Sequence, residues 1–295
     1  MPYQIPLAWQ QPFVNITNPN RRKLNAMIWY MDNQVGLIIN ALKNKGMYDN
    51  SLIIMTSDNG GNLKFRAAGN NYPLRGGKLS FYDGALRVNT FVTGGAIPPS
   101  MRGKRLNDYM HAADLYKTIL DFAGADAAFM EDERAAKYNL PPVEGFSFKD
   151  LWTGKTNTGP RDEIFLGPNA LISGSYKLIT GPQVHSIATA PIWPLADSMQ
   201  PDPIVGINAN KTYNATFGNV DCKKGCLYNI LQDPTESNDL SSVLPDVQNQ
   251  LIERLAELNN TIWYAYRGTP SSLSCVAAVT KWGGFYGPFA PTPVI

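Results

Sequence analysis

The stretch SLIIMTSDNGG, residues 51–61, constrains the fold more than any other part of the sequence. Leu52–Thr56 is a short apolar run without polar alternation, which predicts a parallel strand that is covered on both faces. A serine, a carboxylate, an amide and two glycines follow it directly. Binding sites in open α/β sheets form beyond the carboxyl ends of strands, so Asp58 and Asn59 occupy a position where a site is expected.

Helices and strands alternate around this run. Arg22–Lys45 predicts a long helix that ends at Gly46, because apolar residues recur along it at helical spacing: Leu24, Ile28, Met31, Val35, Ile38 and Leu42. Arg87–Thr93 predicts a second strand and Asp108–Ala123 a second helix. Such alternation favours an α/β sheet.

The composition of the chain changes after Lys137, where Pro, Gly and Thr separate short apolar pieces. We place a domain boundary near Gly154–Pro160, with an α/β part over residues 1–157 and a small α+β subdomain over residues 158–295. In the subdomain, residues 163–181 predict a hairpin of short strands, residues 226–232 a further strand, and Val243–Asn259 a helix. The subdomain is therefore expected to contain an antiparallel sheet.

Charge and hydropathy exclude several classes of function. A net charge of +2, with no long run of either sign, gives no reason to expect a nucleic acid or an anionic membrane as partner. No apolar run reaches the roughly 18 residues of a transmembrane helix. The opening MPYQIPLAWQQPF lacks the features of a signal peptide, so we expect no export signal in this chain.

Four glycosylation sequons nevertheless indicate the secretory route, either to the extracellular space or to the lysosome. They begin at Asn15, Asn210, Asn214 and Asn259. A single sequon arises easily by chance. Four in one chain favour a secreted glycoprotein.

The chain has three cysteines. In an oxidising compartment, Cys222 and Cys226 can form a disulfide across a turn, provided that the geometry allows it. Cys275 is then left over. It is either a small buried apolar residue or the partner of a cysteine outside this chain.

Asp58 and Asn59 are candidate metal ligands. A carboxylate and an amide oxygen side by side are hard donors that suit Ca²⁺ or Mg²⁺. The glycines that follow allow a sharp turn and the close approach of a ligand. The alternative is an Asx-turn, in which both side chains cap their own loop; this is the commoner role of an isolated Asp-Asn-Gly.

Lys78, on a glycine-flanked loop, can present a positive charge to an oxyanion, although a solvated surface lysine is the simpler interpretation. Arg75 can do the same or pair with a carboxylate. His111 is expected to be a buried histidine whose ring is bonded by Asp114. Two histidines, no Gly-x-Ser-x-Gly and no metal-spaced Cys/His cluster exclude a serine-hydrolase triad and a zinc site.

Taken together, three stretches resemble the second half of the sulfatase family, and its arylsulfatase B-like members in particular. They are MDNQVGLIINALKNKGMYDNSLIIMTSDNGG, AGNNYPLRGGKLSFYDGALRVNTFV and HAADLYKTILDFAG, in this order. The later VEGFSFKDLWTGK, ALISGSYKLITG and LYNILQDPTESNDLS are similar to the C-terminal stretch of that family. The resemblance implies the C-terminal part of an alkaline-phosphatase-like sulfatase domain.

The resemblance also implies roles for three residues. Asp58 and Asn59 match the pair that ligates the active-site Ca²⁺, and Lys78 matches the lysine that binds the sulfate of the substrate. In such a site the cation and Lys78 stabilise negative charge on the sulfate oxygens. The expected activity of the whole protein is hydrolysis of a sulfate ester.

The chain lacks the nucleophile and several other active-site residues of the family pattern. That nucleophile is formylglycine, made from a Cys or Ser in a C-x-P-S-R-like motif, and the sequence contains no such motif. The paired aspartates that complete the calcium site, the catalytic histidines and a second lysine are also missing. With an incomplete active site, the chain is expected to be inactive without an N-terminal half.

That N-terminal half, or another chain, is the expected partner, because it supplies strands to the central sheet and covers its apolar face. The resemblance gives Cys275 a bridge to it. The alternative hypothesis is a catalytically inactive sulfatase-like extracellular or structural protein that binds sulfated glycans. The retained Asp58, Asn59 and Lys78 favour the enzyme.

Overall fold

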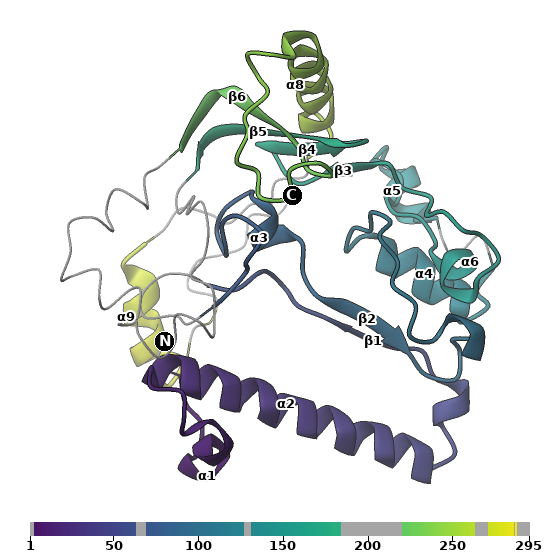
Figure 1. The fold of residues 1–295 in the computed structure, drawn as a ribbon, viewed down its shortest axis with the longest axis vertical. Helices are drawn as coiled ribbons and strands as arrows, with labels where there is room; N and C mark the ends of the chain where they lie inside the picture. Colours follow the sequence, from purple (N-terminus) through teal and green to yellow (C-terminus); the bar gives the residue numbers. More distant parts are fainter. Residues whose placement is uncertain are drawn as a thin grey trace. The chain divides into compact units, whose positions relative to one another are not determined.

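The computed structural model of the chain describes residues 3–62, 69–126, 131–183, 220–262, 271–285 and 287 (Figure 1). Met1–Thr261 forms one compact unit and Ile262–Ile295 a second. The second unit contains the helix α9 (Leu273–Thr280), which carries Cys275 as an exposed free thiol. The interpretation of Cys275 as a small buried residue is therefore wrong.

The longest helix of the first unit is α2 (Pro19–Asn44), as the helical spacing predicts. It begins where the Asn18 side-chain oxygen accepts hydrogen bonds from the backbone N–H groups of Asn20 and Arg21, both at 3.0 Å. The short helices α1 (Leu7–Gln10) and η1 (Gln11–Phe13) precede it, and both contact α2. The turn η2 (Tyr48–Asn50) leads from α2 into the first strand.

The predicted apolar face of α2 is left largely uncovered by the described part of the chain. Exposed fractions of 51%, 43% and 61% are found for three members of this face: Ile28, Met31 and Ile38. Ala26 is the buried residue of this helix. A face of this kind normally lies against other apolar groups.

The first strand, β1 (Ile53–Thr56), pairs with β2 (Thr90–Thr93) in an antiparallel, two-stranded sheet. The expectation of a parallel strand that is covered on both faces is wrong for the described residues, since an apolar run carries no information about strand direction. Ile54 and Val92 pair across the strands and pack against a core of Ile97, Phe148, Leu151 and Trp152. Phe91, the neighbour of Val92, is 46% exposed.

The first unit also contains several short helices. They are α3 (Asp83–Leu86), η3 (Pro99–Met101), α5 (Glu133–Lys137) and α6 (Lys149–Thr153). The helix predicted over Asp108–Ala123 is shorter, because α4 covers only Asp114–Phe122. The Asp114 carboxylate accepts a hydrogen bond from the backbone N–H of His111 at 2.7 Å and holds the preceding residues in a turn.

The expected bond between the Asp114 carboxylate and the His111 ring is not formed; the ring Nδ1 accepts from the N–H of Ala113 at 3.2 Å. Asp114 is fully buried and also accepts from the N–H of Phe146 at 2.8 Å. Its charge is balanced by Arg161, whose Nε donates to the same carboxylate at 2.8 Å. This ion pair fastens the start of α4 to the segment that leads into the second sheet.

The second sheet is antiparallel throughout, as predicted. Its order is β3 (Glu163–Phe165), β4 (Ala170–Ser173), β5 (Tyr176–Gln183) and β6 (Val220–Asn229). Leu171, Leu178 and Leu227 point to one face and pack against Leu251 and Leu255 of the helix α8 (Pro245–Asn259). Figure 1 shows α8 beside this sheet. The opposite face contributes Ile164, Ile172, Ile179 and Tyr228 to a core that includes Tyr82.

Cys222 and Cys226, both in β6, form the disulfide that their spacing allows. Sheet β3–β6 lies entirely within the predicted second domain. Buried ion pairs nevertheless cross the predicted boundary at residue 157, among them Arg161 with Asp114 and Lys177 with Asp83. The boundary stays a prediction.

Replacement of Asp114 by Ala should lower the free energy of unfolding by about 3–5 kcal/mol, because it leaves the Arg161 guanidinium buried without a counter-charge. Urea denaturation measures the change. The matched control is Asp150→Ala, which removes an exposed pair with Lys155 and should cost under about 1 kcal/mol. Equal losses in the two variants would contradict the structural role given to Asp114.

The stability of the chain should fall as the pH drops below about 6.5. Burial lowers the pKa of His111 from its ordinary value of 6.5, and the nearby Arg161 adds to this effect. A lowered pKa means that the unfolded chain binds the proton more readily, so protonation favours unfolding. Urea denaturation at about pH 7.5 and 5 should show a smaller pH dependence for His111→Gln than for the wild type.

Candidate functional site

Asp58 and Asn59 follow β1 directly. The Asp58 side chain is exposed and the Asn59 side chain is half-buried. Neither has a hydrogen-bond or ion-pair partner among the described residues. The loop is closed instead by Ser57, whose hydroxyl donates to the backbone carbonyl of Asn59 at 2.7 Å. Neither side chain forms an Asx-turn, and their oxygens stay available to a ligand.

The glycines after Asn59 allow two loops to touch. The Gly60 N–H donates to the carbonyl of Ala85 at 2.7 Å. A Cβ atom added to Gly60 would lie 1.8 Å from the carbonyl oxygen of Gly84, which no side chain can tolerate. Gly60 is therefore required for the loop of Asp58 to lie against the segment that follows Lys78.

Lys78 is brought to the same place by its own backbone, because its N–H donates to the carbonyl of Gly61 at 3.3 Å. Its side chain is exposed and has no partner among the described residues. The structure thus places the three predicted site residues on two adjoining loops that share backbone hydrogen bonds.

Asn71 holds these two loops together and was not identified from the sequence. Its Oδ1 accepts from the N–H of Gly61 at 2.8 Å, and its Nδ2 donates to the carbonyls of Gly61 at 2.9 Å and Gly76 at 3.0 Å. The sequence showed only a Gly- and Asn-rich loop around it. An asparagine in the loop between the two candidate sites is the signal that could have indicated this role.

Arg75, the other basic candidate, is buried and has a structural role. Its guanidinium lies 4.2 Å from the ring centroid of Tyr82 and donates to the carbonyl of Glu236. Stacking and a backbone hydrogen bond together account for its buried charge. Lys78 is therefore the exposed cation of this loop.

A divalent metal ion fits the donors of this site only in part. Asp58 and Asn59 offer hard oxygen atoms without competing partners, whereas Ca²⁺ takes about six to eight oxygen ligands. The described part of the chain contains no group of three or more His, Cys, Asp or Glu side chains that could complete a metal site. The remaining ligands have to come from elsewhere.

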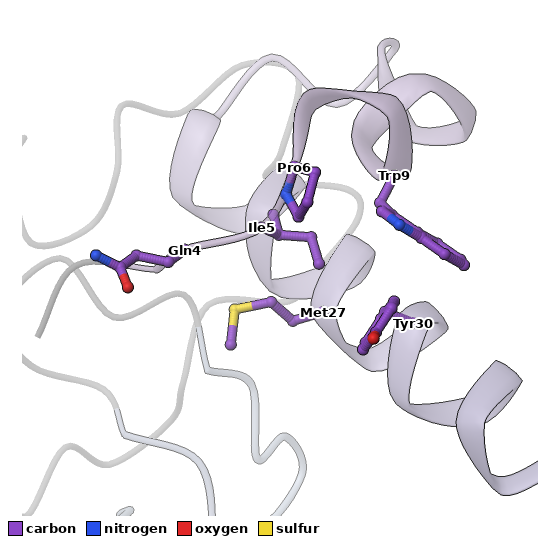
Figure 2. Close-up of a pocket in the computed structure, with 6 residues that line it drawn as sticks. All are labelled: Gln4, Ile5, Pro6, Trp9, Met27 and Tyr30. Carbon is purple, nitrogen blue, oxygen red and sulfur yellow. The ribbon is translucent and has the colours of Figure 1, made fainter.

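A pocket with a volume of about 410 Å³ lies at the N-terminal helices. Figure 2 shows Gln4 at one side of it and the rings of Trp9 and Tyr30 at the other. The two rings meet edge to face, with centroids 4.8 Å apart. No predicted site residue lines this cavity, so it adds nothing to the chemistry of Asp58 and Lys78.

Two of the four sequons fall in the described residues. Asn15 lies exposed in a turn. Asn259 is the last residue of α8, and its side-chain amide donates to the carbonyl of Pro168 at 3.2 Å. Asn210 and Asn214 lie outside the described residues. No helix among those described is long and apolar enough to cross a membrane.

Comparison with known proteins identifies the family. The family model described as Sulfatase matches residues 6–125. Arylsulfatase J of Mus musculus is 29% identical over 280 residues, which are 88% of this chain and 43% of that protein. These matches identify sulfatases as the family that this chain resembles. A second sulfatase, from Formosa agariphila, is 35% identical over 109 residues, 34% of this chain and 19% of that protein.

Solved structures confirm the expected alkaline-phosphatase-like fold. The crystal structure of Ps i-CgsB matches it with a TM-score of 0.62 at 22% identity, over 90% of this chain and 49% of that one. The complex of Ps i-CgsB with k-i-k-neocarrahexaose gives 0.61 at 23% identity, over 90% and 50%. The chain thus spans about half the length, or less, of these relatives.

Gly60→Ala should displace the loop of Asp58 and lower the free energy of unfolding by about 1–3 kcal/mol, because the added methyl group overlaps the Gly84 carbonyl. Gly36→Ala is the matched control. Gly36 lies in α2 with open space around it, so alanine should stabilise the chain by about 0.5–1 kcal/mol. Urea denaturation of both variants measures the change in the free energy of unfolding, which should be a loss for Gly60→Ala and a gain for Gly36→Ala. The same sign in both would contradict the close approach at Gly60.

Proposed function

We propose that this chain supplies the metal- and sulfate-binding part of a sulfatase active site, and that the whole protein hydrolyses sulfate esters. The observation that carries the proposal is the junction of the two loops at Gly60 and Gly61. It places Asp58, Asn59 and Lys78 on neighbouring loops while all three side chains stay without protein partners among the described residues. Similarity to the sulfatase family supports the reaction type.

In this proposal Asp58 and Asn59 would hold Ca²⁺ through their side-chain oxygens. The bound ion would neutralise negative charge on the sulfate oxygens. Lys78 would donate hydrogen bonds to the same sulfate and stabilise the charge that develops in the transition state. The formylglycine nucleophile and the other calcium ligands would be supplied by a segment outside this chain.

Exposed apolar surface supports a partner segment. The uncovered residues on α2 and the exposed Phe91 of β2 leave apolar side chains facing solvent in the described part of the chain. Sheet β1–β2 has only two strands there, which is too few for independent stability. We propose that the N-terminal part of the sulfatase domain covers both. The relatives are about twice as long as this chain, or longer, which leaves room for such a part.

We also propose that the protein works in the secretory pathway, in the extracellular space or in the lysosome. The disulfide between Cys222 and Cys226 fits an oxidising compartment. The exposed sequon at Asn15 is accessible to glycosylation. The relatives include a choline-sulfatase and a steryl-sulfatase, whose names give different substrates, so the comparisons do not identify the sulfated substrate of this protein.

Lys78→Ala, made in the full-length protein that carries this chain, should lower kcat/KM for 4-nitrocatechol sulfate by about 10²–10³-fold, because it removes a donor to the sulfate oxygens. The matched control is Lys104→Ala, at an exposed lysine on another loop, which should retain wild-type activity. Equal activity in the two variants would contradict the role of Lys78.

The chain alone should show no turnover of 4-nitrocatechol sulfate, since it contains no nucleophile motif. Turnover by the chain alone would place the nucleophile inside it and overturn the division of the active site proposed above. A full-length protein that binds sulfated glycans but hydrolyses no sulfate ester would favour the non-catalytic alternative.

A further inference from the structure

The loop that carries Lys78 is exposed at its tip and buried at both ends. Arg75 and Asp83 are 9% and 4% exposed, whereas Lys78 lies in solvent. The base of the loop is closed by a hydrogen bond of 2.7 Å from the Gly84 N–H to the carbonyl of Arg75. The position of Lys78 therefore depends on what holds Arg75 and Asp83.

Glu236, which follows β6 in the chain, contacts both ends of the loop. Its Oε2 accepts a hydrogen bond from the N–H of Asp83 at 2.7 Å, and its backbone carbonyl accepts from the guanidinium of Arg75. Glu236 is fully buried. One residue of the C-terminal subdomain thus holds the two ends of the Lys78 loop at once.

Lys177, on β5, joins the same contacts from the sheet. Its Nζ lies 2.7 Å from Oδ1 of Asp83 and 2.8 Å from Oε1 of Glu236. All three side chains are 6% exposed or less, and the Arg75 guanidinium adds a second positive charge close by. Both carboxylates therefore share the one ammonium group of Lys177, while Arg75 bonds the backbone carbonyl of Glu236.

The segment of Glu236 is itself fixed by a turn. The Asp233 carboxylate accepts from the N–H groups of Ser237 at 2.7 Å and Asn238 at 2.8 Å, and from the hydroxyl of Thr235 at 2.6 Å. Burial alone would raise the pKa of Asp233, but these hydrogen bonds outweigh it and lower the pKa. These contacts fix the backbone that follows Glu236.

Stability alone is a poor reason for such a cluster. Buried ion pairs are costly to desolvate, and apolar residues of similar volume often stabilise a fold as well or better. Charged groups add geometric specificity, because each charge-assisted hydrogen bond holds a donor and an acceptor atom at a defined distance. Here the fixed atoms belong to the ends of the loop that carries Lys78.

We propose that Lys177, Glu236 and Asp83 form a buried latch that sets the position of Lys78 against the sulfate group, and are positioning residues of the sulfatase reaction. The inference rests on the proposed function for the role of Lys78. It assigns to sheet β3–β6 and the segment that follows it an indirect part in sulfate recognition, because the buried latch residues act through Lys78.

Hydrogen exchange tests the latch independently of any activity. In Glu236→Gln the amides of residues 76–83 should exchange about tenfold faster than in the wild type, because the side chain loses its charge-assisted contacts. Asp114→Asn is the matched control: it also neutralises a buried carboxylate that bonds backbone N–H groups and a cation, but it does not contact this loop. It should leave these amides unchanged. Equal acceleration in both variants would overturn the latch.

Kinetics in the full-length protein test positioning. Glu236→Gln should lower kcat/KM for 4-nitrocatechol sulfate by about 10–100-fold, as expected for a misplaced catalytic group. In a Lys78→Ala background the same change should cost less than about twofold, because its effect passes through Lys78. Full additivity of the two losses would overturn the proposal.

Two further outcomes separate the possible failures. A fully active Lys78→Ala protein would refute the proposed function of Lys78, and with it the kinetic part of the inference, while the exchange result still decides the latch. If Glu236→Gln does not fold, Asp83→Asn replaces it. That variant keeps the backbone N–H to Glu236 and removes one of the two carboxylate charges opposite Lys177.

Discussion

The close approach of the loop after β1 to the loop of Lys78 is the contact on which the chemistry of this chain depends. The contact is possible because Gly60 has no side chain that would overlap the Gly84 carbonyl. The Asn71 side chain also forms hydrogen bonds with both loops. Without this contact, Asp58 and Lys78 would be two unrelated surface charges. With it, a carboxylate, an amide and an ammonium group share one small region without a protein partner among the described residues.

Sheet β3–β6 is the second element that fixes the position of the Lys78 loop. Sheet β3–β6 packs one face against α8 and turns the other towards Tyr82, so the sheet forms the support for the Lys78 loop. Arg75 stacks on Tyr82 and bonds the Glu236 carbonyl, which extends the support into the loop. Sheet β3–β6 and the segment of Glu236 are thus joined to the candidate site by buried polar contacts.

Much of this could be predicted from the sequence, for identifiable reasons. The helical spacing of α2, the short strands of the second sheet and the spacing of Cys222 and Cys226 are local patterns, and the structure confirms them. The direction of β1 could not be predicted, because pairing depends on a strand more than thirty residues away along the chain. The shortened α4 was missed because the Asp114 side chain competes with the helix for backbone donors. The cluster of Asp83, Lys177 and Glu236 joins residues that no local pattern connects.

The backbone at Glu236 has a positive φ of 49°, in the left-handed region that glycine and asparagine occupy most readily. Either of these would relax the main chain at this position, and either would also delete the carboxylate that faces Asp83 and Lys177. The polypeptide therefore keeps a residue that its own geometry disfavours. The backbone conformation at this position favours glycine or asparagine, whereas the contacts with Asp83 and Lys177 require a carboxylate. The protein has the carboxylate.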